Sequence, residues 1–171
     1  MLNTLITSKT RLRLLIKFFV SQANTGHLNG LANEFGESTN SIRKELNNLF
    51  NAGYILKSKT NNKIEYNVNS NHPLYETMRK VVMKHLGLED IVETVLKKIG
   101  NVEKIILIGD YAKGVDSGNI EIILNGKDLD MEYISNLENK IERLINRKVT
   151  FYLSSKFLSD QQNIVLYKNE V

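Results

Sequence analysis

The chain has 171 residues, a formal net charge of +4, one proline and no cysteine or tryptophan. Because cysteine is absent, the sequence excludes disulfides, cysteine-ligated zinc, haem attachment and thiol catalysis. The hydrophobic share of 42% and the charged share of 25% are those of an ordinary globular protein, with length for one domain or two small ones.

The most apolar stretch near the N-terminus, residues 14–20, is interrupted by Lys17 and preceded by Arg11 and Arg13. A membrane-spanning helix needs about 20 apolar residues, and a signal peptide needs an uninterrupted apolar region. We therefore expect a buried amphipathic helix here, no membrane association and a cytoplasmic protein.

Three helical patterns fill the first part of the chain. Apolar residues recur at helical spacing within residues 12–19, 28–35 and 42–50. Ser8 and Ser38 are suitable N-caps for the first and third helices, and Gly36 and Gly53 are suitable C-terminal residues for the second and third. The short Gly-containing turn between the second and third helices predicts a helix-turn-helix arrangement.

Two strand-like runs follow, at residues 54–59 and 63–68. Asn61 and Asn62 lie between them, and asparagine tolerates the positive φ angles that a tight hairpin turn requires. Three helices followed by a hairpin predict a winged helix. The polar residues 69–73 predict a linker.

Beyond Pro73, helices alternate with strands. Helical patterns occupy residues 74–86, 92–99 and 134–145, with Asp130 near the start of the last. Strand patterns occupy residues 105–108, 120–124 and 149–153, and residues 164–167 are either an added strand or a docked tail. We therefore expect an α+β protein, with a winged-helix domain at residues 1–72 and a small α/β domain at residues 73–171 that begins with a linker helix.

The charge follows this division. Residues 1–72 carry nine Lys/Arg and four Asp/Glu, whereas residues 73–171 carry fourteen and fifteen, so the net charges are +5 and −1. The basic excess lies in the first domain, which predicts an anionic partner there.

The polar side of the third helix has residue types that read DNA. Arginine can fork onto guanine, asparagine can pair with adenine, and serine or threonine can contact either base. Lysines near the hairpin tip would contact phosphates. The predicted DNA-binding residues are Ser38, Thr39, Asn40, Ser41, Arg43, Lys44, Asn47, Lys57, Lys59, Asn61, Asn62 and Lys63.

Two other interpretations of this surface remain open. Arg43 and Lys44 could be ordinary solvated helix charges, with Arg43 near Asn47 or Glu45. Small winged helices also serve as protein-interaction modules without DNA contact. In either case, the tyrosines Tyr54, Tyr66 and Tyr75 are expected to pack rather than to stack on bases.

The segments Leu28–Ala32, Ser38–Leu46 and Asn51–Ile55 resemble winged-helix regulators of the ArsR-like type, over roughly residues 8–70. Members of that family are typically homodimeric repressors on palindromic sites. The resemblance implies double-stranded DNA and a second copy as partners. The helix at residues 74–86 is the candidate dimer interface.

A second resemblance covers residues 106–114 and Asn119–Glu121, which are similar to the minimal nucleotidyltransferase fold. That family has Gly-Ser after a strand and then an Asp-x-Asp pair that holds two Mg²⁺ ions. Here Gly109 is kept, but Asp110 replaces the serine, Asn119 and Glu121 replace the aspartates, and the later strand offers Thr150 or Tyr152 instead of a carboxylate.

These four residues, Gly109, Asp110, Asn119 and Glu121, therefore form a degenerate nucleotidyltransferase site. Asp110 places a negative charge where phosphates would lie, and Asn119 is a poor ligand for a hard cation. We expect no catalytic residue, no metal and no cofactor. The loop carboxylates are expected to order the loop, with Asp116 paired to Lys113.

We therefore expect a DNA-binding transcriptional regulator whose second domain has lost its chemistry and serves for dimerisation, for sensing a small ligand or for docking a protein partner. The alternative is an active Mg-dependent nucleotidyltransferase that modifies a protein or a small molecule.

Overall fold

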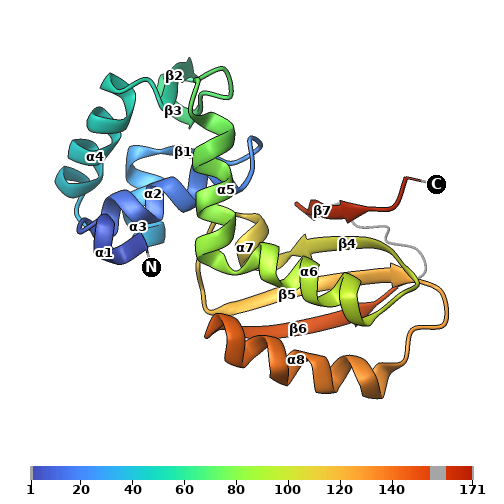
Figure 1. Ribbon diagram of the computed structural model, residues 1–171. Helices are drawn as coiled ribbons and strands as arrows, with labels where there is room; N and C mark the ends of the chain where they lie inside the picture. Colours follow the sequence, from blue (N-terminus) through green and yellow to red (C-terminus); the bar gives the residue numbers. More distant parts are fainter. Residues whose placement is uncertain (1, 155–160, 171) are drawn as a thin grey trace. The chain divides into compact units, whose positions relative to one another are not determined.

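The computed structural model describes residues 2–154 and 161–170. Contacts divide the chain into two compact units, Met1–His85 and Leu86–Val171. Each unit has its own sheet, so the protein is a mixed α and β protein, in agreement with the expected class (Figure 1). Within the described residues, no helix has the length and apolar character needed to cross a membrane.

The first unit contains five helices and three strands among the described residues. In chain order they are α1 (Leu2–Leu5), α2 (Lys9–Val20), β1 (Thr25–His27), α3 (Leu28–Phe35), α4 (Thr39–Asn51), β2 (Ile55–Thr60), β3 (Lys63–Val68) and α5 (Tyr75–Leu86). The strands form an antiparallel sheet in the order β1-β3-β2.

The helix ends follow from the residues predicted to cap them. The Ser8 hydroxyl accepts a hydrogen bond from the Arg11 amide at 3.1 Å, and the Ser38 hydroxyl accepts one from the Ser41 amide at 3.2 Å. Gly36 ends α3 in the left-handed conformation, with φ of 63°. The caps predicted at Ser8, Ser38 and Gly36 are therefore confirmed, whereas the C-cap of α4 is Ala52, and Gly53, with φ of 80°, follows it.

The hairpin turn also forms as predicted. Asn61 and Asn62 have φ of 48° and 61°, and Thr60 pairs with Lys63 across them. Positive φ at both central residues is the geometry that matches the twist of a two-residue hairpin.

The predicted elements omit β1, which is only three residues long and has no alternating pattern. It forms because β3 offers a second edge, on which Gly26 lies opposite Tyr66. A Cβ on Gly26 would lie 2.8 Å from the Leu31 side chain, so a larger residue would not fit between β1 and α3.

Ion pairs connect α2 to the two helices that follow it. Arg11 donates to Glu45 at 2.8 Å, Arg13 to Glu37 at 2.9 Å and Lys17 to Glu34 at 3.0 Å. The Ser8 hydroxyl also donates to Glu45, at 2.8 Å. Ile42 and Leu46, on the same side of α4, are fully buried. This side of α4 is therefore fixed against α2.

Contacts divide the units at the end of α5, between His85 and Leu86, and not at Pro73. Tyr75, the first residue of α5, is buried and its ring lies 5.8 Å from the ring of Phe19 in α2, in a stacked arrangement. The start of α5 is thus packed on the first unit, which a composition-based boundary does not reveal.

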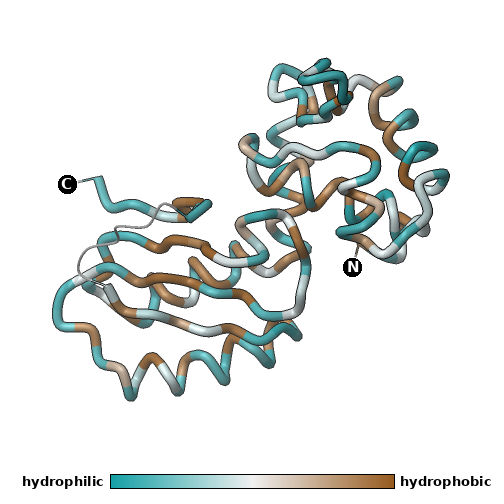
Figure 2. Tube along the Cα trace, turned by 180° about the vertical axis from the view of Figure 1, so that it is seen from behind, coloured by the Kyte–Doolittle hydropathy of each residue, from teal (hydrophilic) through white to brown (hydrophobic). Residues whose placement is uncertain are grey.

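The second unit is built on a four-stranded sheet. Its elements are α6 (Leu88–Lys98), β4 (Val102–Ile108), α7 (Gly109–Ala112), β5 (Asn119–Gly126), α8 (Met131–Ile145), β6 (Lys148–Leu153) and β7 (Ile164–Lys168). The order is β6-β5-β4-β7, in which β5 and β6 are parallel and the other pairs are antiparallel. The chain along these central strands is largely hydrophobic (Figure 2).

Two details complete the comparison with the predicted elements. Residues 164–168 are a strand paired with β4, which resolves the alternatives left open for them. The loop expected after Ile108 instead begins with the short helix α7.

Gly87 separates α5 from α6 with φ of 80°, and a Cβ there would lie 2.7 Å from the Ile145 side chain. Glycine is therefore required at this turn.

Two glutamates of α8 close the outer edge of the sheet. The Phe151 amide donates to Glu138 at 2.7 Å, and the Val149 amide donates to Glu142 at 3.0 Å. An edge strand whose amides already donate hydrogen bonds presents fewer free N–H groups with which another strand could pair. Asp130 caps the start of the same helix by accepting from the amides of Glu132 and Tyr133.

Replacing Glu45 should change how stability depends on pH. Burial raises the pKa of Glu45, but hydrogen bonds from Arg11, Ser8 and Asn48 and the Arg11 charge outweigh it, so the pKa lies below its ordinary value. Such a carboxylate stabilises the folded state above its unfolded pKa, and this stabilisation is lost as pH falls through the folded pKa. Glu45→Gln should lower the free energy of unfolding by about 1–3 kcal/mol at neutral pH.

The measurement is urea unfolding between neutral pH and about pH 3, followed by NMR signals of the first unit. The Glu45→Gln variant should lose less stability on acidification than the parent chain does. The exposed Glu76→Gln is the control, and an equal pH response in both variants would contradict the assignment.

Candidate nucleic-acid interface

The two sides of α4 differ completely in environment. Ile42, Leu46, Leu49 and Glu45 are buried. On the opposite side, every residue predicted to contact DNA is solvent-exposed except Ser41, which is half-buried; the exposed ones are Ser38, Thr39, Asn40, Arg43, Lys44 and Asn47. The fold therefore presents one continuous polar face of α4.

A groove of about 590 Å³ lies between this face, the start of α3 and the hairpin. Its lining residues are His27, Leu28, Asn29, Gly30, Arg43, Asn47, Lys57, Lys63, Ile64 and Tyr66. It brings together four predicted residues from three elements, namely Arg43, Asn47, Lys57 and Lys63. The remaining predicted residues lie outside its lining, at the start of α4, at Lys44 and around the hairpin turn.

The start of α3 is the part of this groove that sequence reasoning missed. His27, Asn29 and Gly30 line it, and the His27 Nδ1 lies 3.0 Å from the carbonyl oxygen of Ile64 in β3. The signal was hidden because these residues adjoin β1, which has no recognisable pattern of its own.

Lys57 is positioned by two aromatic rings. Its Nζ lies 4.0 Å from the ring centroid of Phe50 on α4 and 5.9 Å from that of Tyr66 on β3. Such contacts attract a cation to the ring face and are worth about 0.5–1 kcal/mol at exposed sites. Phe50, expected on the apolar side of α4, is 37% exposed, and Lys57 covers part of its ring.

Tyr66 is the buried floor of the groove. Burial raises the pKa of the Tyr66 hydroxyl, and the nearby positive charge of Arg43 opposes this. The three tyrosines expected to pack do so: Tyr66 and Tyr75 are buried, and the Tyr54 ring lies 4.5 Å from the ring of His72.

The acidic residues of the first unit are engaged elsewhere. Three of its five carboxylates pair with α2, and Glu65 accepts from the Thr25 hydroxyl at 3.1 Å and lies 3.8 Å from His27. Among the described residues, no carboxylate pairs with Arg43, Lys44, Lys59 or Lys63. Arg43 in particular does not pair with Glu45, whose partner is Arg11.

The predicted degenerate site of the second unit assembles around Gly109. Gly109 has φ of 69°. A Cβ on it would lie 3.1 Å from the carboxylate carbon Cδ of Glu121 and closer still to the carboxylate oxygen Oε2. The Tyr152 hydroxyl donates to Glu121 at 3.1 Å, and the Thr150 hydroxyl donates to Asn119 at 3.4 Å. The Glu121 carboxylate thus occupies the space directly over the glycine.

Asp110 and Asp116 have different surroundings. Asp110 is exposed at the start of α7. Asp116 receives two hydrogen bonds from Arg147, at 3.0 and 2.8 Å, and one from the Tyr111 hydroxyl. The expected Asp116–Lys113 pair is therefore wrong, because Arg147, in the bend just before β6, binds the same carboxylate.

Tyr111 shows how tightly this loop is packed. Its side chain is fully buried, and burial together with the neighbouring Asp116 raises the pKa of the Tyr111 hydroxyl well above its ordinary range. Across the residues that the structure describes, no three His, Asp or Glu side chains are grouped so that they could hold a metal ion.

Comparison of the chain with known protein families, with curated proteins and with solved structures finds no match.

Gly109→Ala should destabilise the second unit. The left-handed conformation disfavours a Cβ by about 1–2 kcal/mol, and the clash with Glu121 adds to this. In the double variant with Glu121→Ala, the clash disappears but the backbone strain stays. The double-mutant cycle should therefore show that the two effects are coupled.

The measurement is the free energy of unfolding of the two single variants and the double variant. Gly100→Ala is the control, since a Cβ there meets nothing within 4 Å. Strictly additive effects would mean that the Glu121 carboxylate does not lie over Gly109.

Proposed function

We propose that the first unit is a winged helix that binds double-stranded DNA and that the protein is a transcriptional regulator. The observation that carries the proposal is the unpaired cationic face formed by α4 and the hairpin, with Arg43 and Asn47 in the same groove. Proteins that bind nucleic acids concentrate positive charge on one face in this way.

The order of the elements supports this proposal. Helices α2, α3 and α4 precede the β2–β3 hairpin, and β1 adds a third strand to it. Helix α4 follows a short turn after α3, which is the position of the recognition helix in helix-turn-helix proteins.

The geometry separates the predicted residues into two groups. Arg43 and Asn47 are one helical turn apart on α4, a rise of about 5–6 Å, which is less than the length of two base steps. They are the residues we assign to base contacts, with guanine and adenine respectively. We assign phosphate contacts to Lys57, Lys59 and Lys63 on the hairpin, where charge matters more than shape.

We further propose that the protein acts as a homodimer on a palindromic site, with the second unit used for dimerisation, sensing or docking. The position of Glu121 counts against nucleotidyl transfer. Its carboxylate lies against Gly109 and would repel a phosphate there, where the nucleotidyltransferases that this segment resembles hold phosphates. The exposed residues of the hairpin also suit a protein partner. The salt dependence of binding distinguishes DNA from a protein as the partner.

Replacing Arg43 tests the base contact. Arg43→Ala should weaken binding to a selected duplex site by about ten- to a hundredfold and relax the preference for guanine. Arg43→Lys keeps the charge but not the forked geometry, so it should retain non-specific affinity and lose sequence preference. Lys80→Ala, an exposed cation on α5, removes the same charge outside the groove and should leave binding nearly unchanged.

The measurement is fluorescence anisotropy with a duplex obtained by site selection, over a series of salt concentrations. The logarithm of the affinity should fall steeply with the logarithm of the salt concentration, by about 0.9 per phosphate contact. If random duplex DNA is not bound even at low salt, the DNA-binding proposal fails and a protein-interaction module becomes the better account.

A further inference from the structure

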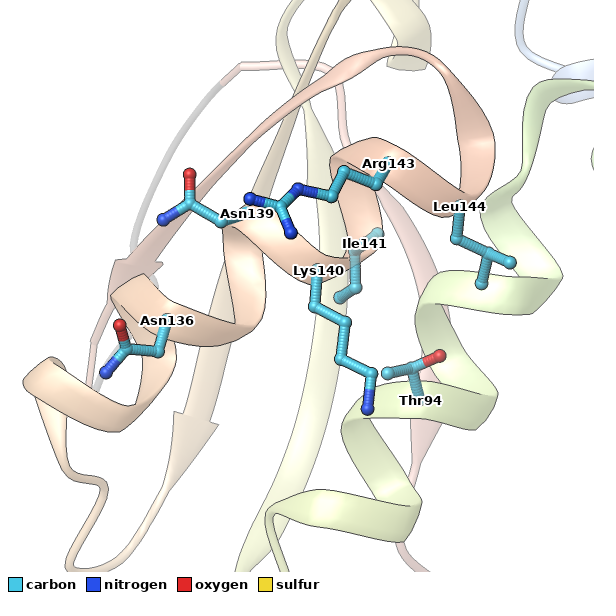
Figure 3. Close-up of a pocket in the computed structure, with 7 residues that line it drawn as sticks. All are labelled: Thr94, Asn136, Asn139, Lys140, Ile141, Arg143 and Leu144. Atoms are coloured by element: carbon cyan, nitrogen blue, oxygen red, sulfur yellow. The ribbon is translucent and has the colours of Figure 1, made fainter.

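A second groove, of about 850 Å³, lies between α6 and α8 in the second unit (Figure 3). Its lining residues are Thr94, Asn136, Asn139, Lys140, Ile141, Arg143 and Leu144. Figure 3 shows Lys140 extending from α8 towards Thr94 on α6, and Arg143 directed back towards Asn139. None of these residues belongs to the cluster around Gly109 and Glu121.

The lining of this groove is rich in hydrogen-bond donors. Lys140, Arg143 and Asn136 have no ion-pair or hydrogen-bond partner among the described side chains. Asn139 uses one donor, which bonds the Ser135 carbonyl oxygen at 3.3 Å. Among the described residues, no carboxylate lines the groove. Its chemistry therefore matches a ligand that carries several anionic oxygen acceptors.

The absence of acids from the groove has a structural cause. Glu138 and Glu142, the carboxylates nearest in sequence to Lys140, accept hydrogen bonds from the β6 amides on the sheet side of α8. Glu93, the neighbour of Thr94 on α6, pairs with Lys97 at 3.5 Å. Residues 86–171 carry eleven Lys/Arg and fourteen Asp/Glu, so this cationic groove forms within a unit whose net charge is −3.

One end of the groove is apolar. The Leu144 side chain is 64% exposed beside Arg143, whereas Ile141 is buried beneath. An exposed leucine next to two cations suits a ligand with a flat apolar part attached to an anionic group. The volume lies in the range of about 300–1,000 Å³ that is usual for small-molecule sites.

We propose that the α6–α8 groove binds phosphate esters, with phosphate groups on Lys140 and on Arg143 and the attached organic part against Leu144. Arginine forks onto two phosphate oxygens, lysine adds a point charge, and the two asparagine amides supply neutral hydrogen bonds. A free nucleotide and the sugar-phosphate backbone of a nucleic acid share this chemistry.

The first arm of the test uses the full chain and ATP without added metal, with the amide NMR signals of α6 and α8 as readout. Saturable shifts in these helices should appear, and the Lys140→Ala/Arg143→Ala double variant should weaken binding at least tenfold. Alanine favours helix, so the double variant should keep α8 folded. Lys127→Ala/Lys148→Ala removes two exposed charges elsewhere in the unit and should bind ATP like the parent chain.

The second arm measures duplex DNA binding against salt for the same variants. If the groove contacts the DNA backbone, the double variant should reduce the salt slope by about one to two and the control should not. This arm rests on the proposed function, whereas the ATP arm does not, so a protein that fails to bind DNA can still bind the nucleotide.

Shifts with ATP assign the groove to a free nucleotide, and a reduced salt slope without them assigns it to a nucleic acid backbone. If neither the shifts with ATP nor a reduced salt slope is observed, the proposal is overturned. It would also be overturned if a polyglutamate peptide of equal charge competed as well as ATP does, because the groove would then attract any anion.

Discussion

The position of helix α4 depends on where the carboxylates of the first unit are placed. Glu45, on the buried side of α4, accepts hydrogen bonds from Arg11 of α2 and from Ser8, the N-cap of α2. Glu37 and Glu34 pair with Arg13 and Lys17 of the same helix. These pairs fix the helices and also remove most of the negative charge from the outer surface. Among the described residues, the cations on the other side of α4 and on the hairpin have no carboxylate partner, which supports the proposed contact with DNA.

In the second unit, too, carboxylates are bound by groups within the fold. Glu138 and Glu142 turn towards the amides of β6, and Asp116 is bound by Arg147 and the Tyr111 hydroxyl. Carboxylates are therefore used to order the loop and to close the sheet edge. Glu121 lies over Gly109, where a phosphate would meet like charge. Because Glu138 and Glu142 face the β6 amides, the cations Lys140 and Arg143 of α8 stay exposed.

Local chemistry made much of the fold predictable. Ser8, Ser38 and Gly36 mark helix ends through caps that depend on a few neighbouring residues, and Asn61 and Asn62 specify a tight turn through their own backbone preference. Features that depend on distant residues were not predictable. Strand β1 exists only because β3 offers an edge, and the unit boundary shifts because the Tyr75 ring stacks on that of Phe19.

Some residues of the candidate site could also be named from the sequence, whereas others depend on distant elements. The polar face of α4 follows from helical spacing, so Arg43 and Asn47 could be named from the sequence. The contribution of His27, Asn29 and Gly30 could not, because it requires the start of α3 to lie beside the hairpin. Likewise, Asp116 was expected to pair with Lys113, three residues earlier in the chain, yet its partner is Arg147, which lies just before β6.

The most direct test of the central claim is an amide NMR titration of the full chain with a short mixed-sequence duplex at low salt. The account predicts that the largest shifts occur along the exposed side of α4, at the start of α3 and in the hairpin, with few on α2. Shifts confined to other elements, or no shifts at all, would contradict the claim that the α4 and hairpin face is a DNA-binding surface.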